Sequence, residues 1–240
     1  YHARSDSQSK IACWTLLCDL LLECDVGRAV ATSGRLGFRI NHMMVGPINK
    51  TLDLVLTIVQ ASRHAGARRT FAELAGVLGV VLDDADRAAL ATLPVFYEEH
   101  ADDVSEVAVA VEAKACMTEH VKSLPRLHAE ILATGYLAKL AAPHCLSVSY
   151  SLVNAASTFV SPSGKGEVNQ HSQPEDARRV VQMISKAVPT ASTNNQYGYD
   201  VIGTTVVDCR NDGSQVTVLQ ADPAPARSDH THYDRMLVSL

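Results

Sequence analysis

The chain has 240 residues, of which 47% are apolar and 20% charged, with 13 glycines and 9 prolines. This composition is typical of a folded globular protein and excludes a disordered, collagen-like or fibrous chain. The formal net charge of -5 excludes a protein that holds nucleic acid by bulk positive charge alone. Any nucleic-acid function must depend on local basic groups, a metal or a partner.

The six cysteines form no Cys-x-x-Cys pair, and four of them lie in strongly apolar segments. This pattern favours reduced, buried thiols in a cytoplasmic protein. The longest apolar stretch, Ile11–Leu22, contains Asp19 and is too short to span a bilayer. No small-residue cleavage site follows it, so we expect neither a signal peptide nor a membrane partner. Because the first methionine is Met43, we expect the natural start to precede Tyr1.

The first predicted element is a helix over residues 10–24, which is apolar on nearly every side and should therefore be buried. Its polar side chains form one stripe at four-residue spacing, Thr15, Asp19 and Glu23. The stripe is either a narrow solvent-facing surface or a carboxylate directed into a site. A glycine-rich segment with a short strand at 36–40 follows.

Residues 50–59 predict the next strand, because four large apolar side chains alternate along it and share one face. Asp53 lies in the middle of this strand on the opposite face. Aspartate is disfavoured at such a position, so Asp53 needs a specific partner or role.

Residues 63–103 are predicted to form a helical insert that begins with a basic loop containing Arg63, Arg68 and Arg69. The pattern Thr70-Phe-Ala-Glu73 is typical of a capping box that opens a helix. The two short helices within Thr70–Leu93 resemble a helix-turn-helix that reads DNA, although plain insertions commonly have the same form.

The strongest predicted strand covers residues 107–115 and contains Glu112 and Lys114. Residues two apart on a strand point the same way, so these two charges share a face with small alanines. Burying a carboxylate and an ammonium group is costly unless they pair or bind a metal. They are therefore either an ordinary exposed ion pair or part of a site.

A helix over residues 118–139 should follow, with Pro125 marking a kink or a restart. Lys122, Arg126 and Glu130 form a stripe along it. Arg126 either pairs with Glu130 within the helix or contacts phosphate together with Lys122.

Further predicted elements are a strand at 145–154, a helix at 174–187 and a hairpin built from 201–208 and 216–219. The tail after Ala221 looks loosely held. This order predicts a single α/β domain over residues 1–240, with a mixed central sheet flanked by helices. The C-terminal helix and hairpin occupy residues 174–220.

Asp53 and Glu112 would hold Mg²⁺, or Mn²⁺ in its place, through oxygen, and the carbonyl of Ala113 could add a ligand. The metal would polarise a phosphate and lower the pKa of a bound water. Lys114 would orient that water and stabilise developing negative charge. This chemistry is phosphodiester hydrolysis.

At this point the sequence resembles the PD-(D/E)XK nuclease superfamily, whose fold is called restriction-endonuclease-like. Leu52-Asp53-Leu-Val55 looks like its first acidic motif, and Val111-Glu112-Ala-Lys114 looks like its second. The resemblance implies a metal-dependent deoxyribonuclease that acts on DNA in defence or repair. It also implies an assisting acid on the first helix, for which Glu23 is the best match and Asp19 the next.

Two features leave alternatives open. The separation of 59 positions from Asp53 to Glu112 exceeds the family spacing, so either the insert accounts for it or Asp102 or Asp103 is the first acid. We prefer Asp53 because it lies in a strand. The acidic net charge suggests that DNA binding needs a homodimer or a partner subunit.

The rival functions are a non-catalytic DNA- or protein-binding module on the same fold and a helix-turn-helix DNA-binding protein.

Overall fold

The computed structural model describes residues 7–59, 70–77, 80–94, 96–97, 106–160, 166–187 and 198–240. Its helices are α1 (Ser7–Glu23), α2 (Asp25–Thr32), α3 (Phe71–Val77), α4 (Asp84–Ala91), α5 (His120–Ala141), α6 (Glu175–Ala187) and α7 (Tyr233–Ser239). Its strands are β1 (Leu36–Met44), β2 (Lys50–Ile58), β3 (Phe96–Tyr97), β4 (Glu106–Cys116), β5 (Leu146–Asn154), β6 (Thr158–Val160), β7 (Val168–Gln170), β8 (Val201–Asp208) and β9 (Thr217–Val218).

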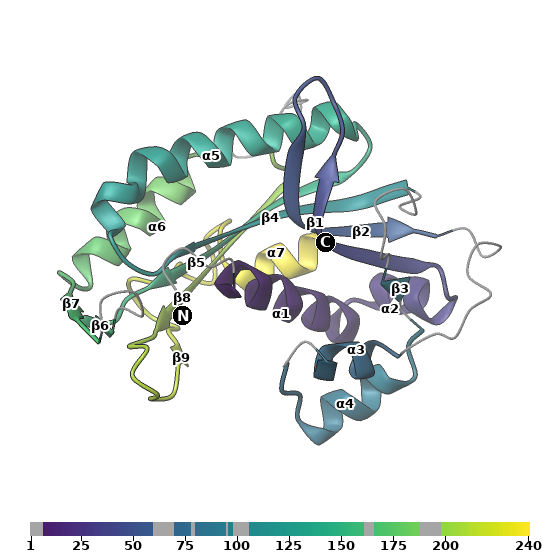
Figure 1. Ribbon diagram of the computed structural model, residues 1–240, viewed down its shortest axis with the longest axis horizontal. Coiled ribbons are helices and arrows are strands. Elements are labelled where there is room, and N and C mark those ends of the chain that lie inside the picture. Colours follow the sequence, from purple (N-terminus) through teal and green to yellow (C-terminus); the bar gives the residue numbers. More distant parts are fainter. Residues whose placement is uncertain are drawn as a thin grey trace.

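The central sheet contains, among the described residues, seven strands in the order β3-β1-β2-β4-β5-β8-β9. Strands β1, β2 and β4 are antiparallel neighbours, whereas β5 runs parallel to β4, and β8 runs parallel to β5. Parallel neighbours need a crossover connection, and α5 and α6 lie in the two crossovers (Figure 1). The predicted α/β class with a mixed central sheet is therefore confirmed.

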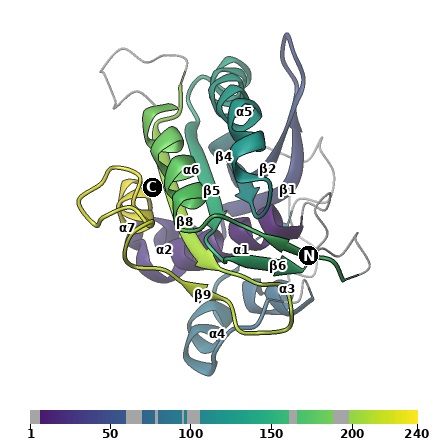
Figure 2. The ribbon, with the colours of Figure 1, turned by 90° about the vertical axis from the view of Figure 1, so that its left-hand side faces the viewer.

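Helices cover both faces of the sheet (Figures 1 and 2). Alternation along β4 divides its side chains between the two layers, because successive residues of a strand point to opposite faces. Val111 and Ala113 pack in the core beneath α1. Ala110 packs on the other side, against Ala138 of α5. This alternation places Glu112 and Lys114 on the α5 side.

Helix α1 is buried on nearly every side, as its composition predicts. Trp14 of α1 lies 5.3 Å from the ring of Phe38 in β1 and 5.4 Å from the ring of Phe71 in α3. The insert helix α3 therefore packs against both α1 and β1 in this core. This explains why α1 keeps no wide polar surface.

The insert helices begin with the predicted caps. The Thr70 amide donates to Glu73 at 2.7 Å and the Glu73 amide donates to the Thr70 hydroxyl at 3.2 Å, which confirms the capping box. Asp83 caps helix α4, and its side chain accepts from the amide of Asp86. Asp84 and Asp86 make the first turn of α4 acidic, a charge that repels DNA phosphates.

The C-terminal segment differs from the prediction. The turn between β8 and β9 has Asn211 and Gly213 at positive φ, as the predicted hairpin requires. The tail beyond it, however, is firmly packed: α7 contacts β8 and α1, and Met236 is 1% exposed. The expectation of a loose tail is wrong, because α7 fills a surface of β8 that the local sequence does not reveal.

All six cysteines lie in the described ranges as free thiols, and five of them are buried. No helix within the described ranges combines the length and the apolar character that crossing a bilayer requires.

Candidate functional site

The antiparallel register of β2 and β4 places Asp53 beside Glu112. Leu54 pairs with Val111 and Val55 with Ala110, so the next position along would bring Asp53 opposite Glu112. Opposed residues of an antiparallel pair lie on the same face of the sheet. The two carboxylates thus meet where the two strands begin to separate.

Beyond Leu54 and Val111, the last backbone pair of β2 and β4 at this end, the side chain of Asp53 accepts a hydrogen bond from the backbone of β4. Its Oδ2 accepts from the backbone amide of Ala113 at 2.9 Å. The hydroxyl of Ser9, at the start of α1, lies 3.5 Å from Oδ1, at the outer limit of a hydrogen bond. The carboxylate of Asp53 is therefore held against the peptide between the other two candidate residues.

The electrostatic environment of Asp53 favours its protonated form. Burial and then the nearby charge of Glu112 raise the pKa of Asp53 to about 6, against the opposing effects of the Ala113 amide, Lys114 and Lys50. The pKa of Asp53 is raised because its carboxyl group is shielded from water and lies close to a second acid, Glu112. Perturbation of this kind is common at functional sites.

Glu112 is almost fully buried, with 2% of its surface exposed. Its Oε1 lies 2.5 Å from Nζ of Lys114 and 3.0 Å from Nζ of Lys50. Its Oε2 is buried and has no hydrogen-bond partner among the described residues. One oxygen of this carboxylate is thus neutralised twice, while the other remains an available acceptor.

Lys114 connects the buried carboxylate with helix α5. Its ammonium group lies 3.4 Å from Oε2 of Glu130, in addition to its contact with Glu112. Burial lowers the pKa of Lys114, but Glu112, Glu130 and Asp53 together outweigh it and the pKa is raised overall. Lys114 therefore carries a positive charge at neutral pH.

The exposed stripe of α5 continues this charge network outward. Nε of Arg126 lies 2.6 Å from Oε1 of Glu130, which confirms the intrahelical pair. Lys122, one turn nearer the start of the helix, pairs with Glu119 at 2.6 Å. The side chains of Lys122 and Arg126 are both 81% exposed. Arg126 is linked to the site through Glu130, whereas no contact among the described residues joins Lys122 to it.

Not every predicted residue joins this cluster. Glu23 lies at the far end of α1, about 21 Å from Ser9 at 1.5 Å per residue, so the structure does not bring it together with Asp53. Asp19 accepts instead from the hydroxyl of Tyr233 at 2.5 Å. Asp102 and Asp103 lie outside the described residues, as do Arg63, Arg68 and Arg69 of the basic loop.

Three further residues, none of which was assigned to the site from the sequence, complete it. Lys50 neutralises Glu112, Glu130 holds Lys114, and Ser9 approaches Asp53. Strict alternation places Lys50 and Asp53 on opposite faces, so the strand pattern hides their proximity. The 3.0 Å contact between Nζ of Lys50 and Oε1 of Glu112 is a tertiary feature, which only the structure reveals.

Asp53 and Glu112 are the groups of this site that could hold a hard divalent cation. Within the described ranges no three His, Cys, Asp or Glu side chains are grouped to hold a metal. Magnesium commonly takes only one or two carboxylates and completes its shell with water and phosphate oxygens. The buried, unpartnered Oε2 of Glu112 and the carboxylate of Asp53 match that limited requirement.

No protein-family model matches the chain, and no curated protein and no solved structure is significantly similar to it.

Proposed function

We propose that this protein is a Mg²⁺-dependent nuclease that hydrolyses phosphodiester bonds in DNA. The observation that carries the proposal is the meeting of Asp53, Glu112 and Lys114 where β2 and β4 separate, with one buried carboxylate oxygen unpartnered. A structural ion pair would be expected to use both oxygens of the buried carboxylate.

The order of elements agrees with the PD-(D/E)XK resemblance. A first helix, the strand of the first acid, the strand of the second acid, a helix and a parallel strand follow one another as α1, β2, β4, α5 and β5. Helices α3 and α4 lie between the two acidic strands and account for the long spacing. We therefore propose the restriction-endonuclease-like fold and, from the resemblance alone, a role in defence or repair.

The proposed mechanism divides the work among the residues of the site. Asp53 and Glu112 hold the cation, with the Ala113 carbonyl as a further oxygen. When bound, the cation polarises the phosphate and lowers the pKa of a bound water. Lys114 orients the attacking water and stabilises the negative charge that develops on the phosphate. Lys122 and Arg126 contact neighbouring phosphates from the exposed stripe of α5.

The test is cleavage of supercoiled plasmid by the purified protein. We expect nicking with Mg²⁺ or Mn²⁺ and none with EDTA. The Glu112→Gln variant should lose about 100-fold or more of the rate, the scale seen when a group that stabilises a transition state is removed. Glu106→Gln, an exposed change at the start of the same strand, is the matched control and should retain activity. Undiminished cleavage by Glu112→Gln would refute the assignment.

One observation favours a second candidate, a non-catalytic DNA- or protein-binding module on the same fold. Lys50 and Lys114 already neutralise Glu112 without a metal, as a purely structural network would. Titration with Mn²⁺, followed by paramagnetic broadening of the Ala113 amide signal, separates the two candidates. A nuclease should show broadening that Glu112→Gln weakens, whereas a binding module should show none at millimolar Mn²⁺.

A further inference from the structure

Strand β5 carries serines on a face where apolar side chains are the rule. Ser147, Ser149 and Ser151 alternate along it, and each is at most 1% exposed. Val153, the next residue of the same series, packs in one cluster with Ile131 of α5, so this face lies under the helices. A parallel strand with helices on both sides normally carries apolar residues on both faces. The serines therefore form a polar layer between β5 and α5 that needs a specific reason.

Ser147 fixes the segment that leads into β8. Its hydroxyl lies 3.0 Å from both Oδ2 of Asp200 and the carbonyl oxygen of Gly198, and its backbone amide donates to the same carboxylate oxygen at 2.7 Å. The residues on either side of Tyr199 are thus tied to the start of β5. Ser147 therefore has a structural role, whereas Ser149 and Ser151 are not accounted for in this way.

Tyr199 lies between α5 and β5. Its ring packs so closely on α5 that a Cβ at Gly135 would lie 3.0 Å from its Cδ2. Burial, and then the charge of nearby Glu112, raises the pKa of Tyr199 well above that of an ordinary tyrosine, although the side chains of Thr134 and Ser149 act against this rise. The hydroxyl of Tyr199 therefore keeps its proton at neutral pH and can donate a hydrogen bond.

Three neighbouring side chains on this face lack a direct partner. Glu112 of β4 stands beside Ser149 of β5 in the register of these parallel strands, so both side chains point to the α5 side. The buried Oε2 of Glu112, Oγ of Ser149 and hydroxyl of Tyr199 make no direct hydrogen bond with any described residue. Buried polar groups are almost always hydrogen-bonded, so these three need a common partner.

One bound water would meet this need. A buried water typically makes about three hydrogen bonds to buried polar groups that have no other partner. Tyr199 can donate to such a water, while Oε2 of Glu112 and Oγ of Ser149 can each accept from it. Donors and acceptors therefore balance around a single molecule.

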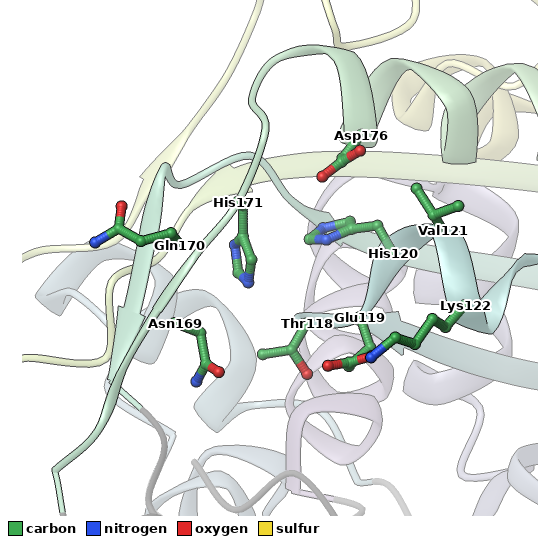
Figure 3. A pocket seen from close by; sticks show the side chains of 9 residues that line it. All are labelled: Thr118, Glu119, His120, Val121, Lys122, Asn169, Gln170, His171 and Asp176. Carbon is green, nitrogen blue, oxygen red and sulfur yellow. The ribbon is translucent and has the colours of Figure 1, made fainter.

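The cavity between the start of α5 and strand β7 offers no comparable match (Figure 3). It has a volume of about 180 Å³, and its walls mix donors such as Lys122 and Asn169 with acceptors such as Glu119 and Asp176. Such a lining favours no one class of ligand. By contrast, the three groups beneath α5 all need the same partner.

We infer that Ser149 and Tyr199 are positioning residues of the candidate site, and that they act through one buried water that donates to Oε2 of Glu112. The inference rests on the proposed function, because its consequence is a Glu112 carboxylate held in the orientation that binds the cation. A carboxylate oxygen has two lone pairs, so the water leaves one of them for the metal. Removing a group that holds a metal ligand in this way commonly costs about 10–100-fold in metal affinity.

The first test is the affinity for Mn²⁺, followed by paramagnetic broadening of the Ala113 amide signal. Tyr199→Phe removes only the hydroxyl and should weaken Mn²⁺ binding about tenfold. Ser149→Ala should have a similar effect, because it removes another partner of the water. Tyr136→Phe makes the tyrosine change on the exposed side of α5 and should bind Mn²⁺ as the wild type does. Wild-type affinity in either Tyr199→Phe or Ser149→Ala would overturn the positioning role.

The second test needs no metal. A double-mutant cycle of Tyr199→Phe and Glu112→Gln, measured by urea unfolding with EDTA, reports whether the two side chains are coupled. We expect the effect of the double change on the unfolding equilibrium constant to differ from the product of the single effects by about fivefold or more. The same cycle with Tyr136→Phe in place of Tyr199→Phe should show no coupling beyond about twofold. Equally small coupling in both cycles would contradict the link between Tyr199 and Glu112.

Together the two tests separate this inference from the nuclease proposal. Coupling in a protein that neither cleaves plasmid nor binds Mn²⁺ would sink the nuclease proposal, and with it the positioning role, and would leave the water link alone. Plasmid cleavage without coupling would leave the nuclease proposal standing and overturn the inference.

Discussion

At the scale of single residues, the candidate site consists of buried or half-buried charged groups of opposite sign that neutralise one another. Two carboxylates and two ammonium groups lie near one another, and one carboxylate, that of Glu112, is almost fully removed from water. Removing ions from water costs several kcal/mol for each, and ion pairing offsets that cost only when every charge has a partner. The cluster is therefore expected to limit stability, which is typical of functional sites.

Asp53 provides a test of this cost. Its pKa of about 6 lies above that of an unfolded aspartate, so the folded chain binds more protons than the unfolded chain between about pH 4 and 6. Stability from this group is thus present at low pH and lost as the pH rises through that window. Asp53→Asn, which cannot ionise, should escape the loss.

The measurement is urea unfolding of both proteins with EDTA at pH 5 and pH 7.5. The stability advantage of Asp53→Asn over the wild type should grow by about 1 kcal/mol between these values. Adding Mg²⁺ at pH 7.5 should stabilise the wild type and not the variant. A difference that is the same at both pH values would contradict the assigned pKa.

The two lysines around Glu112 should be coupled. Lys50→Met or Lys114→Met alone leaves one ammonium group on the carboxylate, whereas the double variant leaves a buried charge unpaired. We expect each single change to cost about 1–2 kcal/mol, and the double change to exceed their sum by about 1 kcal/mol or more. Adding Glu112→Gln to the double variant should recover most of this excess. Simple additivity in urea unfolding would show that Glu112 does not depend on the pair.

At the scale of elements, helix α5 positions the site by lying tightly on the sheet. Leu127, Ile131 and Ala138 are buried beneath it, while Glu130 holds Lys114. Pro125 was expected to kink or restart this helix; the helix runs without a restart from His120 to Ala141, with Pro125 inside it. Burial of its apolar face outweighs the one backbone hydrogen bond that proline removes.

Gly135 of α5 packs closely against Tyr199. A Cβ at this position would lie 3.0 Å from Cδ2 of Tyr199 and 3.1 Å from its backbone nitrogen. Gly135→Ala should therefore lower the free energy of unfolding by about 1–3 kcal/mol, despite the better helix propensity of alanine.

Gly76 in α3 is the matched control, because a Cβ there meets nothing within 4 Å. Gly76→Ala should raise the free energy of unfolding by up to about 1 kcal/mol. Chemical unfolding of both variants checks the pair, and a stabilising Gly135→Ala would show that α5 can move away from Tyr199.

At the scale of the whole molecule, helices α1 and α7, the first and last described elements, share one core. The Tyr233 hydroxyl of α7 donates to Asp19 of α1, and the Tyr233 ring lies 5.3 Å from that of Tyr150 in β5. A Cβ at Gly203 of β8 would overlap the side chain of Met236, so glycine is required where α7 crosses the strand. The C-terminal helix thus closes the face of the sheet that α1 also covers.

Met236→Ala should accordingly lower the free energy of unfolding by about 2–5 kcal/mol, the range for removing a large buried side chain. Val238→Ala changes an 89% exposed residue of the same helix and should stay within about 0.5 kcal/mol of the wild type. Thermal or urea unfolding distinguishes them. Equal effects of the two changes would mean that α7 is not part of the core.

Local patterns predicted those parts of the structure that depend on neighbours in sequence. The capping box at Thr70 and the turn at Asn211–Gly213 arise from hydrogen bonds and φ values within a few residues. Strand β1 reaches Met44, beyond its predicted end at 40, because it pairs with β2 from Leu36 to Met44, interrupted only at Asn41 among these residues. Pairing between strands is not local, so the pattern within one strand underestimates its extent.

The alternation of side chains by itself determined that Glu112 and Lys114 share a face, because period two is a property of any extended strand. It also identified Asp53 as an acid out of place in a strand. Only the tertiary structure decided that Asp53 lies beside Glu112, that Lys50 and Glu130 join them, and that Glu23 does not. Those outcomes depend on strand register and on which end of α1 meets the sheet, and both are set by packing of segments far apart in the chain.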